Sequence, residues 1–89
     1  MFSGSHHDLG ASLFKTWTEE QQRDEIGKLV TGFRGGMPVG ILCKMAETIA
    51  GSPDKAKLHL AHFMPLEERQ QAVSKETGGI RILAEQYLL

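Results

Sequence analysis

Helix-start and helix-stop signals along the middle of the chain constrain this sequence more than any other feature. Thr18 is followed three residues later by Gln21, the pattern of a capping box, in which each side chain hydrogen-bonds a backbone N–H of the other residue. Gly35 and Gly36 then permit the left-handed conformation that commonly ends a helix. These signals predict a helix over about residues 18–34.

Two further helices follow, and both are marked at their ends. Pro38 suits the first turn of a helix, where its missing N–H costs no hydrogen bond, and Gly51 ends the same segment. Ser52-Pro53 begins the next helix, with serine as the cap and proline as the first helical residue. We therefore expect helices over about residues 38–50 and 53–63, joined by short loops that favour antiparallel neighbours.

Apolar residues recur every three or four positions within these segments, which is the spacing of one buried helix face. The segment 38–50 is apolar around much of its circumference, so we place it at the centre of the fold. The three stripes are Gln22, Ile26, Leu29, Val30 and Phe33; Val39, Leu42, Met45, Ala46 and Ile49, with Ile41 flanking; and Ala56, Leu60, Phe63 and Met64.

The carboxyl-terminal third of the chain is less strongly patterned. Pro65 disfavours helical geometry at the residue before it, so we expect a weaker helix over about residues 65–76, ended by Gly78-Gly79. The segment from Ile80 to Leu89 fits a short strand or a helix, and its good helix formers favour a helix over about 80–88. The sequence thus predicts an all-α fold, a small helical bundle of four to five short helices.

Domain organisation is simple in a chain of 89 residues. Residues 1–10 are predicted to form a flexible N-terminal arm, because glycines stand there among small and polar residues. Residues 11–89 are predicted to form a single helical domain. The Gly4–His7 stretch is equally compatible with a cloning remnant.

Composition narrows the function class. Ten Lys and Arg residues against eleven Asp and Glu residues leave no basic stripe, so a nucleic-acid partner is disfavoured. The uninterrupted apolar stretches are far shorter than the roughly 20 residues that span a bilayer, so no membrane partner is expected. The N-terminus lacks the positive start and apolar core of a secretory signal, which predicts a cytoplasmic protein.

His59 and His62 form the candidate metal pair, because residues three apart on a helix project from neighbouring faces. A structural zinc site usually takes four ligands, and only Cys43 and the His6–Asp8 group offer further donors. No C-x-x-C or H-E-x-x-H spacing is present, so two half-exposed helix histidines explain the pair more simply. For Cys43, inside the most apolar helix, a buried and inert thiol is the simpler interpretation.

The apolar residues of so small a domain serve either as core or as an interface. A chain of this size buries only about 60–65% of the surface that its unfolded form exposes, so a protein partner or self-association would add stability. The residues that we expect to bind a partner are Phe33, Val39, Leu42, Met45, Ile49 and Phe63.

One stretch resembles a known family. Leu13-Phe14-Lys15 followed by Thr18–Gln22 resembles the beginning of the C-terminal helical (catalase-related) segment of haem catalases. Gly36-Met37-Pro38 is similar to that segment's glycine before a Val/Met-Pro pair. Ile41 and Lys44 stand at the places of the isoleucine and the basic residue that follow in the family.

The resemblance extends over about residues 13–61, with departures from the family pattern. Ala50–Lys55 and Leu60-Ala61 stand where the family has an Ala-Asp-Pro-x-Tyr-Gly turn and a closing helix, but Ser-Pro replaces Asp-Pro and the Tyr-Gly is missing. The family's haem-ligand tyrosine and catalytic histidine belong to an upstream barrel, so no residue here inherits a catalytic role. The resemblance implies an accessory helical module that packs against something larger.

These observations together predict a non-enzymatic helical module that acts through an apolar helix face, as a homo-oligomer or docked on a larger protein. No cofactor is predicted. An enzyme-class alternative is an accessory part of a haem- or metal-linked antioxidant enzyme, motivated by the resemblance to catalases and by His59 and His62. A second alternative is a small regulatory nucleic-acid-binding protein, against which the near-zero net charge argues.

Overall fold

In the computed structural model, which describes residues 16–89, this part of the chain forms five helices and no strand. The all-α helical bundle predicted from the sequence is therefore confirmed, and the predicted arm over residues 1–10 lies outside the described residues. The helices are α3 (Glu19–Arg34), α4 (Val39–Ala50), α5 (Pro53–Phe63), α6 (Leu66–Ser74) and α7 (Gly78–Leu88).

Helices α3, α4 and α5 begin and end close to where the local signals predict. The N–H of Gln21 donates to Thr18 Oγ1 at 3.1 Å and the N–H of Thr18 donates to Gln21 Oε1 at 2.8 Å, which completes the capping box. Gly51 ends α4 with a φ of 88°, a conformation that an L side chain would strain. The Ser52 hydroxyl accepts the N–H of Lys55 and caps α5.

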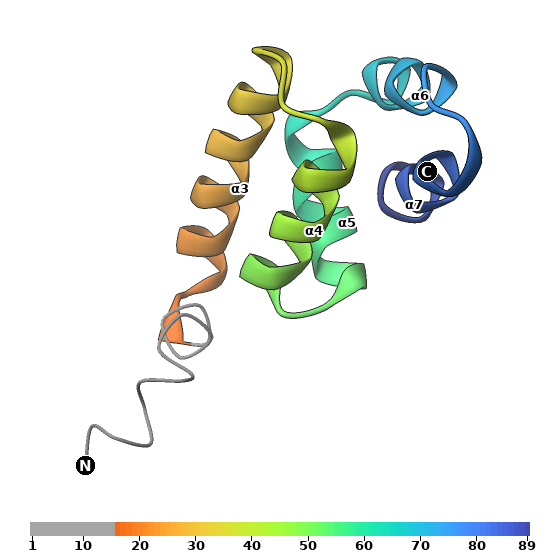
Figure 1. The fold of residues 1–89 in the computed structure, drawn as a ribbon. Helices are drawn as coiled ribbons and strands as arrows, with labels where there is room; N and C mark the ends of the chain where they lie inside the picture. Colours follow the sequence, from red (N-terminus) through yellow and green to blue (C-terminus); the bar gives the residue numbers. More distant parts are fainter. Residues whose placement is uncertain (1–15) are drawn as a thin grey trace, which may run out of the picture.

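The last segment is a helix rather than a strand, and it begins two residues earlier than predicted. The N–H of Arg81 donates to the Thr77 carbonyl at 3.3 Å, so the first turn of α7 closes around Gly78-Gly79 instead of starting after them. Helices α3, α4 and α5 pack against one another, and α4 and α5 also contact α7 (Figure 1).

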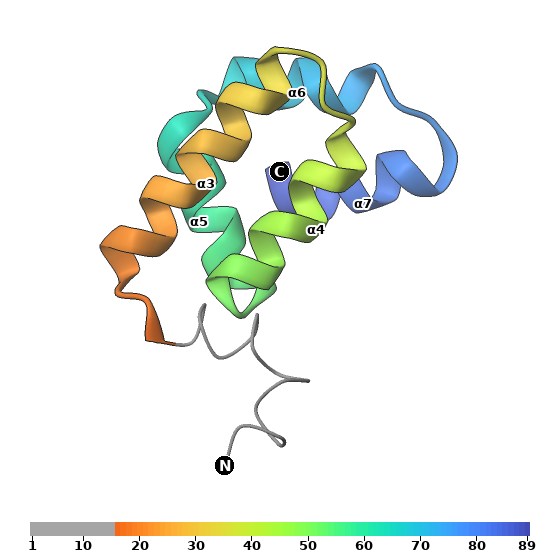
Figure 2. The same ribbon diagram turned by 60° about the vertical axis from the view of Figure 1, so that its left-hand side comes forward.

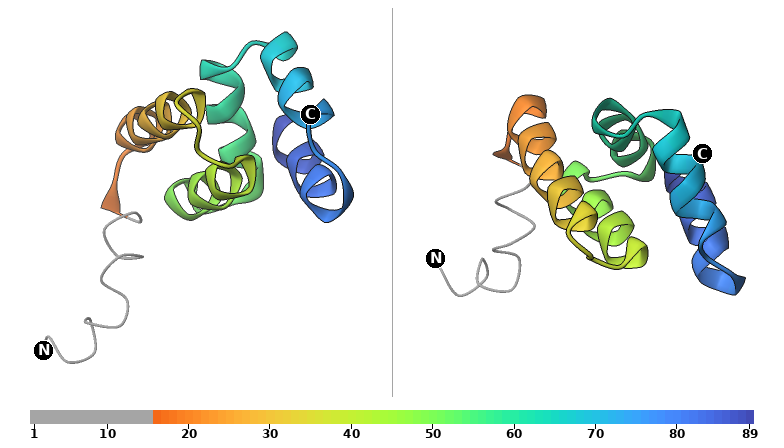
Figure 3. Two further views of the ribbon diagram at one scale, coloured as in Figure 1. Left: turned by 45° about the horizontal axis from the view of Figure 1, so that its top comes forward. Right: turned by 90° about the horizontal axis from the view of Figure 1, so that it is seen from above.

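Helix α4 lies at the centre of the arrangement, as its apolar circumference predicts. It packs against α3, α5 and α7, whereas α6 contacts mainly α7 (Figures 2 and 3). The carboxyl end of the chain lies beside α6, on the far side of the fold from α3 (Figure 3). The largest fully buried side chains are Ile26, Val30, Leu42, Cys43, Leu60, Met64 and Leu88.

A glycine lets α3 and α5 approach closely. A Cβ atom added at Gly27 would lie 2.8 Å from the ring of Phe63, so the ring packs directly on the α3 backbone. Phe63 is therefore held in a contact between two helices of its own chain.

Two arginines bind the carbonyl groups that helix ends leave without partners. Arg69 donates from Nε to the Met64 carbonyl at 2.9 Å and from Nη1 to the Leu88 carbonyl at 2.8 Å. Arg34 donates from Nη2 to the Phe63 carbonyl at 2.9 Å. Since the last carbonyls of a helix have no intrahelical donor, these guanidinium groups tie the ends of α5 and α7 to the bundle.

Candidate interaction surface

The structure places three of the six residues predicted to bind a partner inside the chain's own core. Val39, Leu42 and Ile49 are buried, with exposed fractions of 4%, 0% and 4%. Phe33 and Phe63 are half-buried and pack against that core. Met45 differs from the other five, because 44% of its surface is exposed. The inward face of α4 thus stabilises the monomer, and a docking surface must be sought on its outward face.

The outward face of α4 is also apolar. Ile41, predicted only as a flanking residue, is 48% exposed, and Met45 follows it one helical turn later. These two side chains form a ridge on the surface of α4, which we call the Ile41–Met45 ridge. The apolar circumference of α4 is therefore wider than the core requires.

Beside this ridge α4 and α7 enclose an apolar groove of about 440 Å³, here called the α4–α7 groove. A Cβ atom at Gly40 would lie 3.7 Å from Ile80 Cδ1 and 3.9 Å from Leu83 Cδ2, so α7 lies close to α4 at this point. Ile80 is 47% exposed and Leu83 is half-buried. The groove is lined by Pro38, Val39, Gly40, Ile41, Lys44, Glu76, Ile80 and Leu83.

Two opposite charges flank the groove. Lys44 stands on the α4 side and Glu76 stands on the other side, in the segment that leads into α7. Among the described residues neither Lys44 nor Glu76 takes part in an ion pair. An apolar floor with a polar, charged rim is the usual composition of a protein–protein contact.

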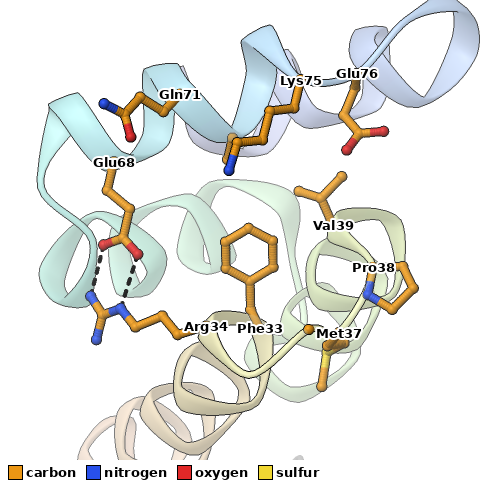
Figure 4. Close-up of a pocket in the computed structure, with 11 residues that line it drawn as sticks. Phe33, Arg34, Met37, Pro38, Val39, Glu68, Gln71, Lys75 and Glu76 are labelled. Atoms are coloured by element: carbon orange, nitrogen blue, oxygen red, sulfur yellow. Dashed lines mark hydrogen bonds and ion pairs between the residues drawn. The ribbon is translucent and has the colours of Figure 1, made fainter.

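A second cavity, of about 550 Å³, lies on the other side of the first turn of α4, between that turn and α6. Figure 4 shows the ring of Phe33 at its centre, with the Lys75 side chain reaching towards it and the Arg34–Glu68 pair on one flank. The guanidinium of Arg34 binds both carboxylate oxygens of Glu68, at 2.9 and 2.7 Å, and this contact lowers the pKa of Glu68.

This cavity offers no excess charge to a ligand. Its cations are Arg34 and Lys75, and its anions are Glu68 and Glu76. It shares Pro38, Val39 and Glu76 with the α4–α7 groove, so the two hollows adjoin around the first turn of α4.

His59 lies on α5 against the amino end of α3. Its Nε2 atom is 3.5 Å from Glu19 Oε1, too long for a strong hydrogen bond, while Lys55 Nζ binds Glu19 Oε2 at 2.8 Å. His59 is 7% exposed, and this burial lowers its pKa; Arg23 and Lys55 act in the same direction and Glu19 opposes them.

We expect the protein to lose stability in mild acid through His59. The unfolded imidazole binds a proton near pH 6.5, whereas the folded one resists protonation, so the unfolded state binds more protons as the pH falls below about 6.5. The contribution of His59 to the free energy of unfolding is complete above about pH 6.5 and is lost as the pH falls towards the folded pKa. Urea unfolding at pH values from 7.5 to 5 gives the free energy of unfolding as a function of pH. In the His59→Gln protein this free energy should fall less towards pH 5. An identical profile in both proteins would contradict this assignment.

The predicted metal pair belongs to no larger group of metal ligands in the described part of the chain. His62 is exposed and stacks edge-on against the Phe63 ring, with centroids 4.8 Å apart, whereas His59 is buried. Residues 16–89 contain no group of three or more His, Cys, Asp or Glu that could hold a metal ion. The His6–Asp8 group lies outside the described residues, so metal binding by the pair stays a prediction.

Cys43 is fully buried, and burial raises the pKa of its thiol to about 11. A thiol with so high a pKa holds little of the reactive thiolate at neutral pH. On the neighbouring α7 the Tyr87 hydroxyl donates to Glu47 Oε1, and this hydrogen bond raises the pKa of Tyr87 to about 12. The Tyr87–Glu47 hydrogen bond therefore joins α7 to α4.

No protein-family model, curated protein or solved structure matches this chain. The resemblance to the catalase segment accordingly stays a prediction from the sequence. Of the helices that the structure describes, none is long and apolar enough to cross a membrane.

Sequence reasoning missed the α4–α7 groove because the groove joins residues about forty positions apart, such as Gly40 and Ile80. Gly40 inside a strongly apolar helix was the available signal, since a glycine has no Cβ atom and so permits another element to approach closely. The position of Ile41 beside the predicted stripe was a second signal.

Proposed function

We propose that this chain is a non-enzymatic protein-interaction module that binds a protein through the α4–α7 groove and the Ile41–Met45 ridge. Three large apolar side chains, Ile41, Met45 and Ile80, stand 44–48% exposed on or beside one hollow. Apolar residues scattered singly over a surface need no explanation, but a group of them around a groove is typical of an interaction site.

The observation that carries the proposal is the excess apolar surface of α4. Its core face is already complete, with Val39, Leu42 and Ile49 buried against α3, α5 and α7. Ile41 and Met45 instead leave nearly half of their surface in water, which is unfavourable for an isolated chain. Covering them with a partner removes this apolar surface from water.

Site-specific photo-cross-linking in the protein's own cells tests the proposal. A photoreactive residue replaces Ile80 in one protein and, as a matched control, Leu58 in another; Leu58 is 71% exposed on α5 and does not line the groove. We expect one discrete cross-linked species from position 80, identified by mass spectrometry and lost when Ile41→Asp is added. Position 58 should yield none.

Two outcomes would contradict the proposal: no cross-linked species from position 80, or the same species from position 58. A haem protein of the catalase kind is one partner class that the mass spectrum would identify, and a second copy of this chain is another. The Ile41→Asp protein should keep its helical circular dichroism, since Ile41 is half-exposed and outside the core.

A further inference from the structure

We infer that the protein bound at the α4–α7 groove is a second copy of this chain, related to the first by a two-fold axis. This inference rests on the proposed function, of which it names the partner. It is carried by two properties of the surface, its shape and the placement of its charges.

The surface carries both a protrusion and a hollow. The Ile41–Met45 ridge stands on α4, and the groove closed by Ile80 and Leu83 lies directly beside it, with Ile41 shared between them. A two-fold contact uses the same patch on both chains, so the patch must supply each knob together with the hole that receives it. With the axis through the groove, the Ile41–Met45 ridge of each copy packs against the Ile80 side of the other copy's groove.

The charges at the rim of the groove are also complementary to those of a second copy. Lys44 and Glu76 stand on opposite sides of the groove, and within the described chain neither has an ion-pair partner. The two-fold rotation that exchanges the sides brings Lys44 of each copy to Glu76 of the other, giving two equivalent ion pairs. A helix from an unrelated protein would need its own matching charges, whereas a second copy brings them with the same sequence.

Charge-reversal variants test this pairing without disturbing the core. Lys44→Glu makes both sides of the groove acidic, and Glu76→Lys makes both sides basic. Lys44 is exposed, and a lysine near the carboxyl end of α6 suits the helix dipole better than the native glutamate, so both variants should fold. Sedimentation equilibrium of the purified full chain over micromolar to millimolar concentrations gives the dissociation constant of each protein.

We expect the native chain to dimerise and each single variant to dissociate about tenfold more readily, since like charges then face each other across the axis. An equimolar mixture of the two variants should recover dimerisation, because the acidic groove meets the basic one. The double variant Lys44→Glu, Glu76→Lys should recover it as well.

A native chain that stays monomeric throughout the concentration range would overturn the inference, as would a dimer indifferent to both charge reversals. In either case the cross-link from position 80 still tests the proposed function separately. A cross-link to a different protein would keep the proposed function and discard the second copy, whereas no cross-link would discard both.

Discussion

Replacing Leu42 with alanine is expected to lower the free energy of unfolding by about 3–5 kcal/mol, the upper part of the range for fully buried leucines. Leu42 is 0% exposed on the helix that packs against three others, so its removal leaves a cavity that little can fill. A domain of this size has a total stability of roughly 4–13 kcal/mol, so much of the folded population would be lost. Urea unfolding followed by circular dichroism at 222 nm measures the change.

Leu58→Ala is the matched control, because it removes the same atoms from a side chain that is 71% exposed. We expect the control to change the free energy of unfolding by less than about 0.5 kcal/mol. Equal losses in the two variants would show that Leu42 does not lie in the core described above.

Replacing Arg69 with alanine should cost about 2–4 kcal/mol, because each hydrogen bond from a charged donor contributes about 1.5–3 kcal/mol and two are lost together with some solvent compensation. The half-buried guanidinium binds the Met64 and Leu88 carbonyls at 2.9 and 2.8 Å, and so holds the end of α5 and the end of α7 at once. Hydrogen exchange of the Arg69→Ala protein should show that the last turn of α7 opens before the rest of that helix.

Arg81→Ala provides the control, since Arg81 is exposed and reaches only Glu85 of its own helix, at 3.6 Å. A change within about 0.5 kcal/mol is expected there. Arg69→Lys should recover only part of the loss, because one ammonium group cannot span both carbonyls. If Arg69→Ala and Arg81→Ala behave alike, the bridging role of Arg69 is wrong.

Local chemistry explains why the helices could be predicted from the sequence. The Thr18 capping box, the Gly51 stop and the Ser52-Pro53 start each depend on residues no more than four positions apart. The helical stripe of Ile26, Leu29 and Val30 is buried as its spacing requires. The first turn of α7 was misplaced because glycines ordinarily end helices, whereas here they begin one.

The features that could not be predicted all join distant parts of the chain. Arg69 reaches Leu88 over 19 residues, and Lys55 reaches Glu19 over 36, and no local pattern specifies either pairing. The burial of His59 likewise depends on where α3 comes to lie against α5. The α4–α7 groove could not be predicted for the same reason. Periodicity assigned Val39 and Leu42 to one apolar face of α4, but it did not show which apolar residues of that helix remain exposed to solvent.

Methyl NMR of the purified protein tests most directly whether a second copy covers the surface around Ile41 and Ile80. The chain has five isoleucines, of which Ile26 and Ile49 are buried in the core. Ile82 is 59% exposed but lies about 200° around α7 from Ile80. On dilution from millimolar to micromolar concentration, the Ile41 and Ile80 methyl signals should shift while the other three stay constant. Five signals that do not change with concentration would contradict the claim.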